Sequence, residues 1–169
     1  HDTGNIIKFD LKRFPQFLEP QGLNYWRRVK KDFIEKYGSE DHEATYTIAK
    51  EAGLKKQFFN LLKSIGFSKT EQIFKSVEFE RKIVAYSDQR VAPNGVVSLE
   101  ERHKESKKRY ADKVTDKYTS DRFDYLSNLN KEIEKQIFEY CKIKPEDITE
   151  EKVKPLLEEL RDFDINTLI

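Results

Sequence analysis

The chain has 169 residues, of which 37% are hydrophobic and 37% are charged. This length predicts one domain, or two at most, and 12 Phe and 8 Tyr residues are too many for a disordered chain. The formal net charge is only +1, which argues against nucleic acid as a partner. No apolar run approaches the roughly 20 residues that span a bilayer, so we expect no membrane partner.

The cysteine count and the first residue bear on where the chain is found. Cys141 is the only cysteine and cannot form an internal disulfide, which predicts a reduced, cytoplasmic setting. The chain contains no Met and opens with His1, so we expect that it does not begin at a translation start. A targeting signal would then have been part of the preceding segment.

The first half of the chain has apolar residues at helical spacing, separated by glycines. The spacing predicts one helix from Leu23 to Tyr37, stopped by Gly38, and a second over residues 41–52. A third helix is expected from Phe58 to Ile65. A fourth should begin at the capping-box spacing of residues 68–71, with an apolar stripe of Ile73, Val77 and Val84 that Glu80 interrupts.

The second half begins with a break. Residues 91–97 interrupt the helical pattern, and Asn94-Gly95 is a turn signal. Residues 98–101 have capping-box spacing and predict a long polar helix with Leu99, Tyr110, Val114 and Tyr118 on one side. Two more helices are expected, one from Phe123 to Tyr140 and one in the tail, which Pro155 starts or interrupts. No strand with period-two alternation is evident, so the sequence predicts an all-α helical bundle.

The residues of greatest chemical interest are the His1-Asp2 pair and Asp88. His1 and Asp2 are adjacent, and an imidazole nitrogen and a carboxylate oxygen can bind one divalent metal. Asp88 lies four residues after Val84, so it continues an apolar helix face, where a carboxylate is costly unless it is paired or bound to a metal. Alternatively, the helix has ended and Asp88 caps the loop or pairs with Arg90.

The remaining histidines and the cysteine have simpler interpretations. His42 is expected in the first turn of a helix, either exposed or facing the site. His103 is expected on the surface or partly packed, without a functional role, and Cys141 is expected to be a small core residue. The sequence contains no phosphate-binding glycine loop, no dinucleotide-binding glycine motif and no Gly-x-Ser-x-Gly element, and one cysteine excludes zinc-finger spacing.

Four segments in this order resemble the HD superfamily of metal-dependent phosphohydrolases. His-Asp-Thr-Gly-Asn at residues 1–5 resembles the family's His-Asp-x-Gly signature, and Asp-His-Glu-Ala at residues 41–44 resembles its next histidine element. Tyr-Ser-Asp-Gln-Arg-Val at residues 86–91 resembles the closing element, and Ser-Leu-Glu-Glu-Arg at residues 98–102 the helix that follows it in many bacterial members. The resemblance covers about residues 1–110.

The resemblance implies a metal site. It implies that His1, Asp2 and Asp88 ligate a divalent metal and that His42 occupies a position that binds a second metal in some members. The family's first histidine, on an upstream helix, has no counterpart in the chain. Mixed histidine and carboxylate ligation suits Mn, Fe, Co or Ni, and Mg less well.

The resemblance also implies a reaction. The expected function is metal-dependent hydrolysis of a phosphate ester, with a nucleotide or another phosphorylated small molecule as substrate. Asp2 would also orient the attacking water. Because Asn5 stands where many members have Lys, Lys8 or Arg90 would supply positive charge to the phosphate.

Two alternatives and the domain organisation complete the expectations. The domain is either an enzyme, or a catalytically inactive HD-like regulatory or ligand-binding domain, or a structural helical adaptor. Residues 1–118 are expected to form the HD domain, with residues 119–169 as a C-terminal helical extension packed on it. That extension completes the core or mediates contact in a homodimer.

Overall fold

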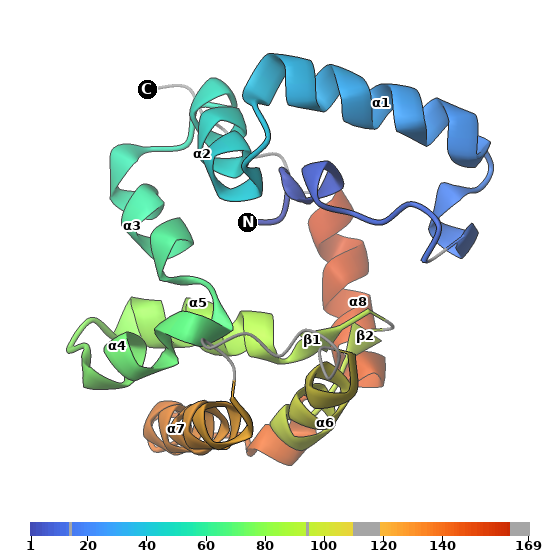
Figure 1. The fold of residues 1–169 in the computed structure, drawn as a ribbon. Helices are drawn as coiled ribbons and strands as arrows, with labels where there is room; N and C mark the ends of the chain where they lie inside the picture. Colours follow the sequence, from blue (N-terminus) through green and yellow to red (C-terminus); the bar gives the residue numbers. More distant parts are fainter. Residues whose placement is uncertain (14, 94, 110–118, 163–169) are drawn as a thin grey trace. The chain divides into compact units, whose positions relative to one another are not determined.

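The computed structural model describes residues 1–13, 15–93, 95–109 and 119–162. In this part of the chain almost all regular structure is helical, which confirms the all-α prediction (Figure 1). The α-helices are α1 (Gly22–Tyr37), α2 (Asp41–Glu51), α3 (Lys56–Ser64), α4 (Thr70–Lys75), α5 (Phe79–Gln89), α6 (Leu99–Arg109), α7 (Ser120–Phe138) and α8 (Glu150–Arg161). Short 3-10 helices are η1 (Asn5–Ile7), η2 (Pro15–Leu18), η3 (Phe67–Lys69) and η5 (Pro145–Asp147).

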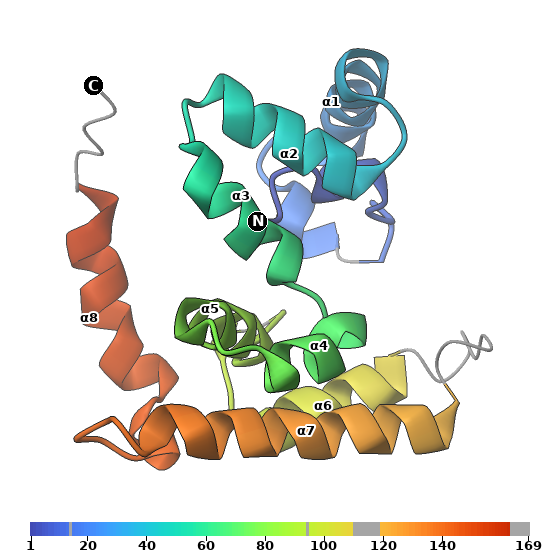
Figure 2. The ribbon, with the colours of Figure 1, turned by 90° about the vertical axis from the view of Figure 1, so that its left-hand side faces the viewer.

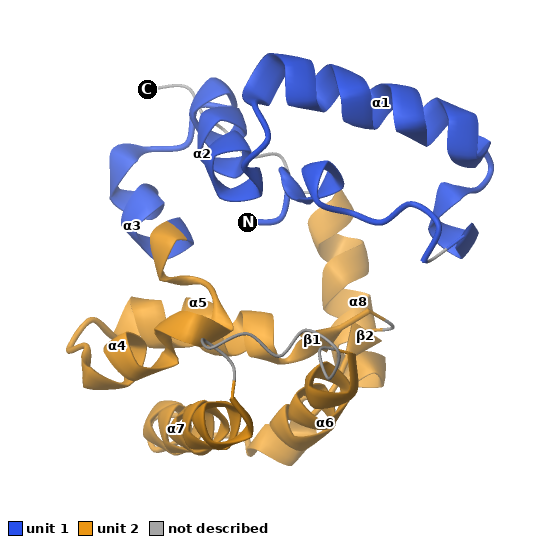
Figure 3. Ribbon diagram, viewed as in Figure 1, with its two compact units in different colours: residues 1–62, 167–169 blue, residues 63–166 orange. Residues whose placement is uncertain are grey.

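The described residues form two compact units (Figure 3). Unit 1 contains residues 1–62 and unit 2 contains residues 63–162. The domain boundary expected at residue 118 lies outside the described residues, as do Tyr110, Val114 and Tyr118, which were expected on the long polar helix.

Unit 1 is built on short helices packed against α1 and α2. Its buried apolar side chains are Ile7 from η1, Leu11, Leu18 from η2 and Ala44 from α2. The bounds of α1 agree with the prediction from apolar spacing. Gly38 ends α1 with φ +84°, a left-handed conformation that favours glycine, and its N–H donates to the Ile34 carbonyl at 2.9 Å.

The predicted fourth helix is in fact two helices. The chain leaves α4 at Ser76, where ψ is 140°, and re-enters a helix as α5 at Phe79. The Ser76 hydroxyl accepts the N–H of Glu78 at 3.1 Å, a local bond that competes with continuation of the helix. Val77 is 97% exposed in this break, so the prediction that it belongs to the apolar stripe was wrong.

One of the two predicted capping boxes is present. The Ser98 N–H donates to the Glu101 carboxylate at 2.9 Å and the Glu101 N–H donates to the Ser98 hydroxyl at 3.2 Å, so both start α6 as predicted. The box at residues 68–71 is absent, because η3 includes Ser68 and α4 begins at Thr70 without a side-chain cap. The Thr70 hydroxyl there donates to the Phe67 carbonyl at 2.8 Å.

A short β-hairpin with two residues in each strand separates α5 from α6. Strands β1 (Val91–Ala92) and β2 (Gly95–Val96) pair antiparallel, with Val91 opposite Val96. Of the predicted Asn94-Gly95 turn, Asn94 lies outside the described residues. The strands were not predicted, because two residues are too few to produce an alternating pattern.

Unit 2 is organised around α7. In Figure 2, α4, α5 and α6 lie along one side of it. Ile133 and Ile137 project from α7 into a buried cluster that the neighbouring helices complete. The other buried members of this cluster are Ile73 of α4, Tyr86 of α5 and Leu99 of α6.

The last helix leaves its apolar side chains exposed. Leu156, Leu157 and Leu160 of α8 are 56%, 49% and 61% exposed, and Pro155 lies within the helix. The prediction that the tail completes the core therefore has no support from these three residues. Among the described residues, no helix combines the length and the apolar character needed to cross a membrane.

His103 is a buried residue of unit 2, which corrects the expectation of a surface or partly packed position. It is 7% exposed on α6, its ring lies beside those of Phe67 and Phe123, and its Nε2 lies 3.3 Å from the Asn130 amide nitrogen. Burial lowers the pKa of His103 to about 4, and the charges of Lys131 and Arg102 act in the same direction.

We predict that His103 makes the stability of unit 2 depend on pH. Because the pKa is about 4 in the folded state and 6.5 in the unfolded state, the unfolded chain binds the proton more tightly. The stabilisation is complete above pH 6.5 and is lost as the pH falls toward 4. The loss should reach up to about 3 kcal/mol.

Urea unfolding between neutral and acidic pH measures this effect. The variant His103→Gln keeps an acceptor for Asn130 but does not titrate, so its stability should fall less over the same range. An identical pH dependence in both proteins would disprove the assignment to His103.

Candidate functional site

The His1-Asp2 dyad places two potential ligand atoms side by side. His1 Nε2 lies 3.2 Å from an Asp2 carboxylate oxygen. Two adjacent ligands of one ion, each at about 2.1 Å from it and at right angles, lie roughly 3 Å apart. The two ligand atoms are therefore close enough to share a divalent cation once the hydrogen bond between them is given up.

Asp2 is held in the ionised form that a cation requires. The hydrogen bond from His1 lowers the pKa of the Asp2 carboxyl, partial burial opposes this, and the His1 charge, an Asn5 hydrogen bond and the Lys8 charge lower it further. The net effect is a lowered pKa, so Asp2 carries its negative charge at neutral pH.

The turn that carries the dyad rests on the first turns of α2. The Gly4 N–H donates to the Thr45 hydroxyl at 3.0 Å. A Cβ atom added at Gly4 would lie 2.2 Å from the Asp41 carbonyl oxygen and 2.8 Å from the Thr45 hydroxyl oxygen. Only glycine allows this approach, so Gly4 fixes the dyad against the segment that contains His42.

We predict that Gly4→Ala destabilises unit 1. The added methyl group collides with backbone, which cannot rotate away, and overpacking of this kind typically costs about 1–3 kcal/mol. Urea unfolding followed by circular dichroism measures the loss. Thr3→Ala, at the exposed neighbouring position, is the control, and equal stability of the two variants would contradict the packing argument.

Lys8 and His42 complete the group of predicted site residues in unit 1. The Lys8 ammonium forms an ion pair with the Asp41 carboxylate. Burial raises the pKa of Asp41, but the hydrogen bond and charge of Lys8, with a contribution from His42, outweigh it and leave the pKa lowered. His42 is exposed in the first turn of α2, as one of its two sequence interpretations expected. Sequence reasoning assigned Asp41 no role; its place beside His42 in the second family-like segment was the available signal.

Asp88 belongs to unit 2, where it lies in the last turn of α5. The helix continues to Gln89, so the alternative in which the helix ends before Asp88 was wrong. Its side chain is half-buried and accepts a hydrogen bond from the Gln89 amide at 2.8 Å.

Arg90, also in unit 2, is 5% exposed and surrounded by acceptors. Its guanidinium donates to the Tyr86 hydroxyl and to the Val97 carbonyl. It also donates to the carbonyls of Pro145, at 3.3 Å, and Ile148, at 2.8 Å. A guanidinium with these partners anchors the end of α5 to η5 and to the start of the α8 segment.

The same network includes a carboxylate. Glu134 of α7 lies 3.6 Å from the Arg90 guanidinium and accepts the Tyr86 hydroxyl at 2.7 Å. Burial, followed by the Glu134 hydrogen bond, raises the pKa of Tyr86 strongly, and Arg90 opposes the increase. Tyr86 therefore stays protonated, and its hydroxyl donates a hydrogen bond to Glu134.

The predicted site residues are thus divided between the units. His1, Asp2, Lys8 and His42 belong to unit 1, where His1 contacts Asp2 and Lys8 contacts Asp41 beside His42, and Asp88 and Arg90 lie in unit 2. Among the described residues, no group of three or more His, Cys, Asp or Glu side chains is arranged to hold one metal ion. Comparisons with known protein families, with curated proteins and with solved structures find no match for this chain.

Proposed function

We propose that this chain is a metal-dependent phosphohydrolase whose centre is the His1-Asp2 dyad. The observation that carries the proposal is the 3.2 Å separation of His1 Nε2 and the Asp2 carboxylate, on a turn held against α2 by Gly4. The proposed substrate is a nucleotide or another small phosphate ester, and the metal is Mn, Fe, Co or Ni, with Mg as a weaker candidate.

Each residue has a role in this proposal. Within unit 1, His1 and Asp2 would hold the cation and His42 would hold a second one, and the resemblance alone implies Asp88 as a further ligand. A bound divalent cation supplies an acidified water and positive charge for the phosphoryl oxygens. Asp2, ionised at neutral pH, would orient the attacking water through its second oxygen, and Lys8 would pair with a phosphoryl oxygen.

Lys8 is better suited than Arg90 to meet the phosphate. The Lys8 side chain is 57% exposed, so it can exchange Asp41 for a ligand at little cost. The Arg90 side chain is 6% exposed and donates to three backbone carbonyls, which a ligand would have to replace. The proposal therefore assigns the phosphate to Lys8 and leaves Arg90 as a positioning residue.

The test measures metal binding and turnover separately in the full-length protein. Mn²⁺ binding is followed by electron paramagnetic resonance, and hydrolysis is followed by phosphate release from nucleoside mono- and triphosphates. Asp2→Asn should lose binding and turnover, because a neutral amide is a poor ligand for a divalent ion. Asp32→Asn removes the same charge from an exposed position on α1 and should change neither.

The outcomes separate the alternatives. Mn²⁺ binding that depends on Asp2 but gives no turnover would indicate a regulatory or ligand-binding domain instead of an enzyme. No Mn²⁺ binding by the unaltered protein would exclude the metal-dependent hydrolase and favour the helical adaptor over a metal-binding regulatory domain.

A further inference from the structure

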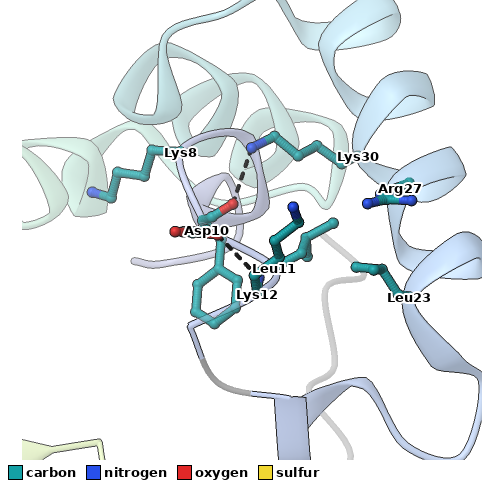
Figure 4. Close-up of a pocket in the computed structure, with 8 residues that line it drawn as sticks. Lys8, Asp10, Leu11, Lys12, Leu23, Arg27 and Lys30 are labelled. Carbon is teal, nitrogen blue, oxygen red and sulfur yellow. Dashed lines mark hydrogen bonds between the residues drawn. The ribbon is translucent and has the colours of Figure 1, made fainter.

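Unit 1 contains an open groove with an unusual charge, shown in Figure 4. It has a volume of about 430 Å³, within the range of small-molecule sites. One wall is the segment from Lys8 to Lys12, and the other is α1, which contributes Leu23, Arg27 and Lys30. Four cationic side chains and one carboxylate, Asp10, line it, although the chain as a whole is almost neutral.

The cations converge for a local reason. Leu23, Arg27 and Lys30 are spaced four and three residues apart, so they lie on one face of α1. The Lys30 ammonium donates to the Phe9 carbonyl at 3.0 Å, which ties this face to the opposite wall. In Figure 4, Lys12 extends into the space between the walls and Lys8 points away from it, while Arg27 lies beside α1, where its guanidinium donates to the Asn24 side chain at 3.4 Å.

Little of this positive charge is neutralised. Lys12, Arg27 and Lys30 form no ion pair within the described part of the chain. The Asp10 carboxylate accepts the backbone N–H of Lys12 at 3.0 Å, so it is engaged in its own turn. Three cations held together in this way repel one another, and an anion that enters the groove relieves that repulsion.

The ligand chemistry follows from the donors. Arginine binds phosphate through two parallel N–H groups, and lysine contributes a point charge with three donors. A single phosphate carries about two negative charges, fewer than the cations present. A chain of phosphates carries more charge and offers an anionic group to each cation.

We propose that this groove binds an oligophosphate, either free or as part of a nucleoside triphosphate. Lys12, Arg27 and Lys30 hold the phosphates, and Phe9 on one wall and Leu23 on the other provide apolar surface beside them. Binding requires no metal. Only its connection to hydrolysis, through Lys8 at the edge of the groove, rests on the proposed function.

The experiment is calorimetric titration of the full-length protein with tripolyphosphate, ATP and orthophosphate, in the presence of a chelator. Tripolyphosphate should bind at least about tenfold more tightly than orthophosphate, and more weakly at high salt. Equal affinities for ATP and tripolyphosphate mean that the phosphate chain alone is recognised. A higher affinity for ATP means that the apolar side chains contribute. Both results support the proposal. Similar affinity for orthophosphate and tripolyphosphate, or no binding, overturns it.

A pair of double variants separates the groove from general charge. Lys12→Ala with Arg27→Ala should weaken tripolyphosphate binding at least about tenfold. Arg28→Ala with Lys31→Ala removes the same charge from exposed positions of α1 outside the groove and should have an effect below about threefold. Equal losses in the two double variants would show nonspecific attraction and overturn the site. The chelator removes divalent metals, so the two proposals are tested separately. Absence of oligophosphate binding would not contradict the proposed hydrolase, and absence of metal-dependent hydrolysis would not contradict oligophosphate binding.

Discussion

Asp88→Asn should reduce metal-dependent phosphate-ester hydrolysis by about a hundredfold or more while the helices remain intact. The substitution replaces a carboxylate, which the resemblance implies to be a ligand, by a neutral amide of the same size, so the cation would lose one of its few strong partners. The amide oxygen of the substituted side chain can still accept from Gln89, as the carboxylate does at 2.8 Å, so the local structure of α5 should persist. Phosphate release with added Mn²⁺, and circular dichroism of the same samples, measure the two effects.

Glu80→Gln is the matched control for this experiment. Glu80 is an exposed carboxylate on the same helix, α5, and no family-like segment includes it. Its neutralisation should leave turnover within about twofold, since a surface charge contributes little. Full activity in Asp88→Asn, or equal losses in both variants, would exclude Asp88 as a ligand.

The helices of unit 1 were predictable because local signals agree there. Apolar spacing and a stop at Gly38 set the limits of α1. Signals of this kind act within a few residues, so a single sequence contains them. The break between α4 and α5 was missed for a related reason. The hydrogen bond between the Ser76 side chain and the Glu78 N–H interrupts the single helix that the apolar residues from Ile73 to Val84 predict.

Burial of polar residues was harder to predict. His103 lies on α6, a helix rich in charged side chains, and the one nearby indication of burial is Leu99, four residues earlier on the same face. Its environment comes from Phe67 and Phe123, which are distant in the chain. Only tertiary contacts determine whether a polar position on such a helix faces solvent.

The candidate site shows the same limit. The adjacency of His1 and Asp2 is visible in the sequence. The placement of their turn against α2 is not, because it depends on the packing of Gly4 against residues 41–45. The groove of unit 1 was missed because its cations come from two segments, residues 8–12 and α1, and balanced composition conceals a local excess. The i, i+4, i+7 spacing of Leu23, Arg27 and Lys30 was the available signal.

Arg90→Ala should destabilise unit 2 by about 3–5 kcal/mol, the loss expected when one member of a buried charged network is removed. The variant leaves Glu134 without its cationic neighbour and deprives the carbonyls of Pro145 and Ile148 of their donor. Since whole domains are stable by only about 5–15 kcal/mol, this loss is a large share of the total. Urea unfolding followed by circular dichroism gives the free energy.

Arg122→Ala is the control, and the pair distinguishes an anchor from a catalytic cation. Arg122 pairs with Glu71 at 3.0 Å on the surface of unit 2, with 42% of its side chain exposed, so its loss should cost no more than about 1 kcal/mol. If Arg90 is an anchor, Arg90→Lys should also lose stability, because an ammonium cannot reproduce the planar set of donors to Val97, Pro145 and Ile148. If Arg90 instead serves the phosphate, Arg90→Lys should unfold like the unaltered protein and lose only turnover.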